Sequence, residues 1–172
     1  DYYLILSRLV PYKRIDLAVE ACTRLGRQLV VIGDGPDRQR LQQTAGKNVK
    51  FLGRLPDEVV NRYLSRCRAL LFPGEEDFGM TPLEVNASGR PVIAFRKGGA
   101  TETVIERETG VFFNHQTVNS LAEAIEELES ISWDRKKIRL HAEKFDRKVF
   151  DRRILDFIRE VMPVALTDEV LE

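Results

Sequence analysis

Six short apolar runs recur along the chain, and helical or turn-like segments separate them. None of the runs alternates apolar with polar residues, so each is typical of a strand buried on both faces of a parallel sheet. Strands that alternate with helices through right-handed crossovers predict an α/β fold with a doubly wound, Rossmann-like parallel sheet of about six strands. The runs lie at residues 2–6, 29–32, 49–52, 69–72, 91–95 and 111–113.

The segments between these runs carry helical patterns. One predicted helix has an apolar face made of Ile15, Ala18, Val19, Cys22 and Leu25. From residue 133 onward the pattern is purely helical, so we predict a single domain over residues 1–162 that ends in helices, followed by a frayed tail at 163–172. Further helices are predicted at residues 37–45, 56–65, 81–88 and 119–131.

An apolar stripe runs along the C-terminal helical region, and basic residues lie among its members. A basic amphipathic helix can lie on a membrane surface. More often such a helix docks against its own protein, and docking is the outcome we expect here. The stripe consists of Phe145, Val149, Ile154, Phe157, Ile158 and Val161, with Arg147, Lys148, Arg152 and Arg153 among them.

Composition narrows the class of protein. The 27 basic residues balance the 27 acidic ones, so no global attraction to nucleic acid is expected. Cys22 and Cys67 have neither metal nor redox spacing, which favours a reduced, cytoplasmic setting. No apolar stretch reaches membrane-spanning length. Because the chain opens directly in a predicted core strand, we expect it to be a domain of a longer protein.

Two carboxylates, Glu76 and Glu84, follow the fourth apolar run with seven residues between them. A turn at the carboxyl end of a strand is where open α/β sheets bind ligands. The free N–H groups of the helix that starts there favour an anion, and Gly79 lets a ligand approach the backbone closely. This combination suits a ligand that is part sugar and part phosphate.

The same residues have a purely structural interpretation. Thr81 and Glu84 fit a capping box, with Thr81 as the N-cap and Pro82 in the first helical position. Capping and ligand binding are equally compatible with Glu84 at this stage. The structural alternative for Glu76 is a solvated loop carboxylate.

The loop after the first run offers two cations, Arg8 and Lys13. It contains no glycine, which weighs against an NAD or FAD fingerprint. Each cation alone is typical of a solvated surface charge. Together at the ligand-binding rim they predict a pyrophosphate clamp, in which the arginine forks onto phosphate oxygens and the lysine acts as a point charge.

Glycine-rich turns follow several other runs. Gly33 and Gly35 follow the second run and allow close backbone approach, although such a turn is also a good connector. Gly53, Arg54 and Leu55 follow the third run, where backbone groups can meet a base edge. His115 and His141 form no triad, and no cluster has metal-ligand spacing, so we expect neither a metal nor a cofactor.

Together these motifs resemble the C-terminal, donor-binding half of a retaining glycosyltransferase of family 4, with the GT-B fold. The resemblance extends from residue 2 to about residue 161. Its most specific part is the Glu76-to-Glu84 element with an internal Phe78 and Gly79. The other matching parts are Ser7-Arg8-Leu9 with Lys13, Gly33-Asp34-Gly35-Pro36, Phe51-Leu52-Gly53 and Gly98-Gly99.

The resemblance implies a role for each site residue. Arg8 and Lys13 would bind the diphosphate and stabilise the departing nucleotide. Glu76 would hold hydroxyls of the transferred sugar, and Glu84 would hold the ribose hydroxyls. The remaining donor-binding residues would contact the base, sugar and phosphate, and they are Gly33, Gly35, Arg54, Leu55, Phe78, Gly79, Met80 and Thr81.

The resemblance also implies partners. The residues around Glu76 and Gly98 are similar to those of the mannosyltransferase branch, so GDP-mannose is the leading donor, and a UDP-sugar is the alternative. The acceptor, a glycan or a lipid-linked molecule, would bind an N-terminal domain that this chain lacks. The final helices, at residues 133–162, would pack back toward that domain, so we expect this chain alone to expose apolar surface there. Such an enzyme would work in the cytoplasm or at the inner membrane surface, without a metal.

Three alternatives remain open at this stage. A sugar-nucleotide epimerase of the GT-B fold uses similar binding residues, and so does a non-catalytic nucleotide-sugar module. A glycoside hydrolase with Glu76 and Glu84 as its acid and base is disfavoured, because the cations at Arg8 and Lys13 have no purpose in that mechanism.

Overall fold

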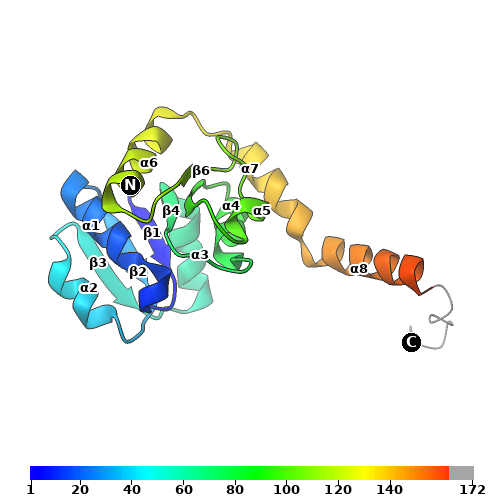
Figure 1. Ribbon diagram of the computed structural model, residues 1–172, viewed down its shortest axis with the longest axis horizontal. Helices are drawn as coiled ribbons and strands as arrows, with labels where there is room; N and C mark the ends of the chain where they lie inside the picture. The colour runs from blue at the N-terminus through cyan, green and yellow to red at the C-terminus, as the bar shows by residue number, and fades with distance from the viewer. Residues whose placement is uncertain (163–172) are drawn as a thin grey trace.

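Six parallel strands form a single sheet in the order β3-β2-β1-β4-β5-β6 (Figure 1). The computed structural model describes residues 1–162. The predicted doubly wound parallel sheet is confirmed, and the strands lie within one or two residues of the predicted runs. They are β1 (Tyr3–Leu6), β2 (Leu29–Ile32), β3 (Val49–Gly53), β4 (Ala69–Phe72), β5 (Val92–Phe95) and β6 (Gly110–Phe113).

The inner strands are almost completely buried, as continuous apolar runs require, because helices cover both faces of the sheet. The prediction of burial on both faces was wrong for β3. This strand lies at the edge of the sheet, its side chains are mostly half-buried, and Lys50 is exposed. Edge position alone does not account for this, because β6 lies at the opposite edge of the sheet and is fully buried.

Eight α-helices and two short 3₁₀ turns connect or follow the strands in the described part of the chain. The predicted helices are present, and the short helix α5 adds one turn after the paired glycines Gly98 and Gly99. The helices are α1 (Ile15–Leu25), α2 (Arg38–Thr44), α3 (Asp57–Arg66), α4 (Met80–Ala87), α5 (Ala100–Thr103), α6 (Val118–Ser130), α7 (Arg135–Ala142) and α8 (Arg147–Val161), and the turns are η1 (Pro11–Lys13) and η2 (Glu143–Phe145).

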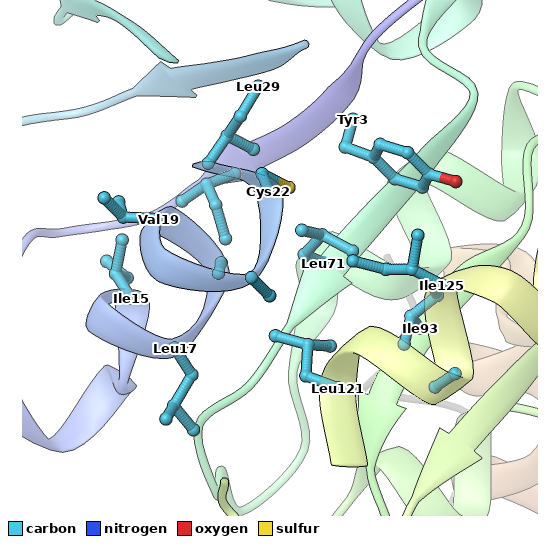
Figure 2. Close-up of a cluster of buried hydrophobic side chains, with 14 of the residues drawn as sticks. Tyr3, Ile15, Leu17, Val19, Cys22, Leu29, Leu71, Ile93, Leu121 and Ile125 are labelled. Atoms are coloured by element: carbon cyan, nitrogen blue, oxygen red, sulfur yellow. The ribbon is translucent and has the colours of Figure 1, made fainter. Parts of the chain in front are cut away.

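Two hydrophobic clusters hold the helices to the sheet, one on each face. On one face, α1, α2 and α6 pack on the strands, and Figure 2 shows Cys22 of α1 between Leu29 and Leu71 of the sheet. On the other face, α3, α4 and α5 contribute Leu64, Val85 and Ala100 to a second cluster. The sheet therefore forms the middle layer of three.

The last two helices, α7 and α8, differ in how they pack. Helix α7 packs on α4 and buries Ile138 and His141. Helix α8 has no buried residue and extends away from the sheet (Figure 1). The apolar stripe of α8 does not dock on the rest of the described chain, and Phe150 and Phe157 are 63% and 59% exposed, so the expected exposure of apolar surface in the final helices is confirmed for α8. The predicted tail at 163–172 lies outside the described residues.

None of the helices within residues 1–162 combines the length and the apolar composition that crossing a membrane requires.

A partly buried hydrogen-bond network joins the amino end of β1 to α6. The Tyr3 hydroxyl donates to Glu129 at 2.9 Å, and the Arg27 guanidinium donates to both oxygens of the same carboxylate at 2.8 and 2.7 Å. Burial alone would raise the pKa of Glu129, but hydrogen bonds from Arg27 and Tyr3 overcome it and lower that pKa below its usual value. The ionised carboxylate therefore stabilises the folded chain.

Replacing Glu129 by glutamine is expected to lower the free energy of unfolding by about 1–2 kcal/mol at pH 7, because two charge-assisted hydrogen bonds are weakened. A carboxylate whose folded pKa is depressed contributes stability above its unfolded pKa and loses it as pH falls through the folded pKa. The difference from wild type should therefore shrink from about pH 4.3 downward. Urea denaturation of both proteins at several pH values measures this difference in unfolding free energy.

The control is Glu123→Gln, which removes the same charge from an exposed position on α6. It should change the unfolding free energy little at any pH. Equal losses in the two variants, or a difference that does not depend on pH, would contradict a role for the ionised Glu129.

Candidate donor-binding site

The strand order places a crevice between the carboxyl ends of β1 and β4. These strands are neighbours, yet β1 leads into α1 on one face of the sheet and β4 leads into α4 on the other. Such a reversal is the topological switch point at which open α/β sheets bind ligands. The loops that follow β1 and β4 carry the candidate residues Arg8, Lys13 and Glu76.

Lys13 and Glu76 form an ion pair across this switch point. Their side chains are 19% and 18% exposed, so the pair is largely shielded from water. A small pocket between the two loops is lined by both residues together with Ser7. The Lys13 ammonium also lies 5.2 Å from the centre of the Tyr12 ring, a cation–π contact. The structure thus brings together two candidates that are far apart in the sequence.

Main-chain contacts fix the loop that carries Glu76. The Glu76 carbonyl accepts a hydrogen bond from the Gly99 N–H at 2.8 Å, and the Pro73 carbonyl accepts one from the Gln116 side chain at 2.9 Å. Gly74 lies against the backbone of Lys13, where an added Cβ would come within 2.9 Å of the Lys13 Cα. The loop of Glu76 is therefore anchored to the segments of Gly99 and Gln116, and it also contacts the backbone of Lys13 independently of the ion pair.

The glycine turn after β2 supports the loop that carries Arg8 and Lys13. The Ser7 N–H donates to the Ile32 carbonyl at 3.1 Å, and the Leu9 N–H donates to the Asp34 carbonyl at 3.0 Å. Gly33 has a φ of +127°, and a Cβ there would lie 1.8 Å from the Ser7 carbonyl oxygen. No other residue fits this approach. Gly35 is similarly close to the Leu9 backbone, so its role in the structure is support for the loop.

A cavity of about 540 Å³ opens beside the switch point. It brings together Gly33, Arg54, Leu55 and Glu84, which lie on three different segments of the chain and were all predicted as donor-binding residues. Its other lining residues include Asp57 and Asn61 on α3, along with apolar side chains of β1, β2 and α3.

Asp57 and Asn61 were missed by the sequence analysis. Asp57 lies in the first turn of α3, where an acidic residue commonly complements the helix dipole. That structural role accounts for Asp57 in the sequence without a binding role. The spacing of Asp57 and Asn61 by four residues, which places them on one helix face, was the only available signal.

Glu84 does not cap α4. The helix begins at Met80, the N-cap is Gly79 with a φ of 78°, and no side chain makes a cap hydrogen bond there. The capping-box interpretation of Thr81 and Glu84 was therefore wrong, because the left-handed Gly79 starts the helix before Thr81. Glu84 instead borders the cavity, where desolvation and the nearby charge of Asp57 raise its pKa above the usual value.

Other predicted residues occupy the outer rim. Phe78 and Met80 are exposed and line a second, larger cavity of about 700 Å³ between α4, η2 and α8, and Glu84 also borders it. Arg8 is exposed on the β1 loop and lines neither cavity. Thr81 is half-buried in the first turn of α4 and likewise lines neither.

Other chemistries find little support among the side chains of residues 1–162. No group of three or more His, Cys, Asp or Glu there is placed to hold a metal ion. Cys22 and Cys67 are buried, and burial raises the pKa of each thiol to about 12, so neither is a thiolate nucleophile. His141 is buried with its Nε2 2.9 Å from the Thr103 carbonyl, a structural contact.

The family model described as Glycosyl transferases group 1 matches residues 1–145, which contain every residue of the crevice. The chain belongs to this family. The match confirms the resemblance to family 4 glycosyltransferases of the GT-B fold that the motifs around Glu76 indicated. It ends at the last residue of η2, so α8 lies beyond it.

This group 1 glycosyl transferase has relatives among bacteria and archaea. It is 35% identical over 138 residues to a GDP-mannose-dependent monoacylated alpha-(1-6)-phosphatidylinositol monomannoside mannosyltransferase of Corynebacterium glutamicum, covering 71% of this chain and 36% of the relative. It is 29% identical over 166 residues to an uncharacterized glycosyltransferase of Methanocaldococcus jannaschii, covering 94% of this chain and 47% of the relative.

A solved structure, a sucrose-phosphate synthase of Thermosynechococcus elongatus, superposes with a TM-score of 0.81 at 26% identity. The superposition covers 95% of this chain and 46% of that one. The group 1 glycosyl transferase chain therefore spans less than half the length of these three similar proteins.

Replacement of Gly33 by alanine is expected to lower the free energy of unfolding by about 2 kcal/mol or more, because a Cβ would overlap the Ser7 carbonyl. The matched control is Gly26→Ala, whose φ is +65° and whose Cβ would meet nothing within 4 Å. That variant should lose only about 1 kcal/mol, the cost of the left-handed backbone. Urea denaturation compares the two, and equal losses would show that the Gly33 turn tolerates a side chain.

Proposed function

We propose that this chain is the donor-binding half of a retaining glycosyltransferase that transfers mannose from GDP-mannose to a glycan or lipid-linked acceptor. The observation that carries the proposal is the Lys13–Glu76 pair at the switch point, beside the cavity that Glu84 borders. A cation for phosphate, a carboxylate for sugar hydroxyls and a nucleoside-sized cavity are the parts that a nucleotide-sugar requires. The GDP-mannose dependence of the Corynebacterium glutamicum relative supports the choice of donor.

Each part of the donor has a proposed partner. The base lies against Arg54 and Leu55, and the ribose hydroxyls donate to the Glu84 carboxylate at the same cavity. The diphosphate lies between Lys13, Arg8 and the free N–H groups at the start of α4, from Gly79 to Thr81. Glu76 accepts hydrogen bonds from hydroxyls of the sugar.

The proposed chemistry is electrostatic. Breaking the bond between the anomeric carbon and the phosphate oxygen leaves negative charge on the nucleoside diphosphate and positive character on the sugar. Lys13 and Arg8 stabilise the first charge without a resident metal, and the carboxylate of Glu76 lies near the second. The acceptor enters on the same face that the leaving group vacates, which retains the configuration.

The acceptor site belongs to an N-terminal domain in this proposal, in keeping with the chain spanning less than half of its similar proteins. The enzyme then works in the cytoplasm, at the membrane surface where its acceptor is lipid-linked. The phosphatidylinositol mannoside in the name of the Corynebacterium glutamicum relative supports that acceptor class.

Calorimetric titration of the chain tests donor binding. We expect GDP to bind and NAD not to bind, with UDP and ADP weaker than GDP. Lys13→Ala and Glu84→Ala should each weaken GDP binding about tenfold, because each removes hydrogen bonds that involve a charged group.

Lys47→Ala is the control for Lys13, since Lys47 is an exposed lysine before the amino end of β3. It should leave the affinity unchanged. Binding of GDP that both site variants retain in full would contradict the proposed site, and tighter binding of UDP or ADP would contradict the choice of GDP-mannose.

Transfer activity gives a second test. The chain alone should bind GDP-mannose but release no GDP from it in the presence of mannoside acceptors, because the acceptor site lies in another domain. Chromatographic detection of GDP measures this. Turnover by the chain alone that Lys13→Ala abolishes would contradict the proposal that the acceptor site lies in another domain.

A further inference from the structure

Lys13 and Glu76 bind each other, although the proposed function gives them different partners on the donor. Lys13 is assigned to the diphosphate and Glu76 to the sugar hydroxyls. The ion pair between them means that each group competes with the donor for the other. Donor binding is therefore an exchange of partners.

The surroundings make the exchange sensitive to what the ligand offers. Both side chains are largely shielded from water, so a charge that loses its partner there is poorly solvated. The contact of Gly74 with the Lys13 backbone keeps the two loops close together, and the bond from the Gly99 N–H to the Glu76 carbonyl anchors the loop of Glu76. The exchange of partners is therefore mainly a rearrangement of the two side chains.

Two ligands differ in this respect. A sugar nucleotide takes Lys13 with its diphosphate and compensates Glu76 with hydroxyl donors of its sugar. A bare nucleoside diphosphate takes Lys13 in the same way but leaves the Glu76 carboxylate without a partner in a shielded site.

We infer that Glu76 sets the preference of the site for sugar nucleotide over bare nucleoside diphosphate, by competing with the phosphates for Lys13. The inference rests on the proposed function and adds a specificity role to Glu76. After transfer, the sugar no longer compensates Glu76, so the carboxylate returns to Lys13 and weakens the hold on the product. Product release is thus coupled to loss of the sugar.

The test measures the affinities of GDP and GDP-mannose for wild type and Glu76→Gln. The substitution keeps the shape of the side chain and removes the charge that competes for Lys13. GDP should bind about three- to tenfold more tightly to Glu76→Gln, while GDP-mannose should bind no more tightly than to wild type. The preference for the sugar nucleotide therefore falls.

Asp77→Asn is the matched control, because it removes the same charge from the next residue, which is exposed. It should leave the ratio of the two affinities unchanged. Glu76→Ala provides a second variant and should shift GDP affinity in the same direction as Glu76→Gln, with circular dichroism confirming the fold of each.

The outcomes separate the inference from the proposed function. If wild type binds neither GDP nor GDP-mannose, the proposed donor site fails. If wild type binds both, but Glu76→Gln and Glu76→Ala leave GDP binding unchanged or weaken it, only the competition is overturned. An equal gain in Asp77→Asn would also overturn it, since general charge removal would then explain the effect.

Discussion

The pairing of β1 with β4 is the interaction on which the site depends. Tyr3 and Leu4 pair in parallel register with Ala69 and Leu70, although the two strands are separated by β2, β3 and three helices in the chain. This pairing joins the two halves of the sheet and creates the switch point. It also brings the loops that follow these strands into contact, so that Lys13 and Glu76 meet.

The loops of the site are held by main-chain contacts, whereas side chains at its outer rim are exposed. Main-chain hydrogen bonds and close glycine contacts position the loops of Lys13 and Glu76, because backbone groups lack rotamer freedom. Phe78 and Met80 at the outer rim are exposed side chains with few constraints. Charged groups that must exchange partners thus lie on a rigid frame, which is the arrangement that precise binding requires.

The fold was predictable because strands buried in a parallel sheet leave continuous apolar runs, which a sequence shows directly. Glu76 and Glu84 were found through their position after β4. The start of α4 was predicted two residues late, because Thr81 fits the common N-cap pattern. The N-cap is instead Gly79, in a left-handed conformation that the sequence does not show. The apolar stripe of α8 predicted a contact without showing which partner makes it, and the exposure of α8 in this chain was expected only through the resemblance to a two-domain family. Asp57 required the tertiary arrangement, since only the cavity shows where α3 faces.

The position of β1 has a consequence for how the chain reaches its folded state. β1 precedes the other five strands of this sheet in the chain, but it lies in the middle of the sheet, and the edge that β4 covers stays open until β4 has been added. A half-folded chain therefore has a loop with Lys13 but no partner loop. A ligand that contacts both loops binds only the chain in which the sheet is complete. By mass action it therefore stabilises the domain as one cooperative unit.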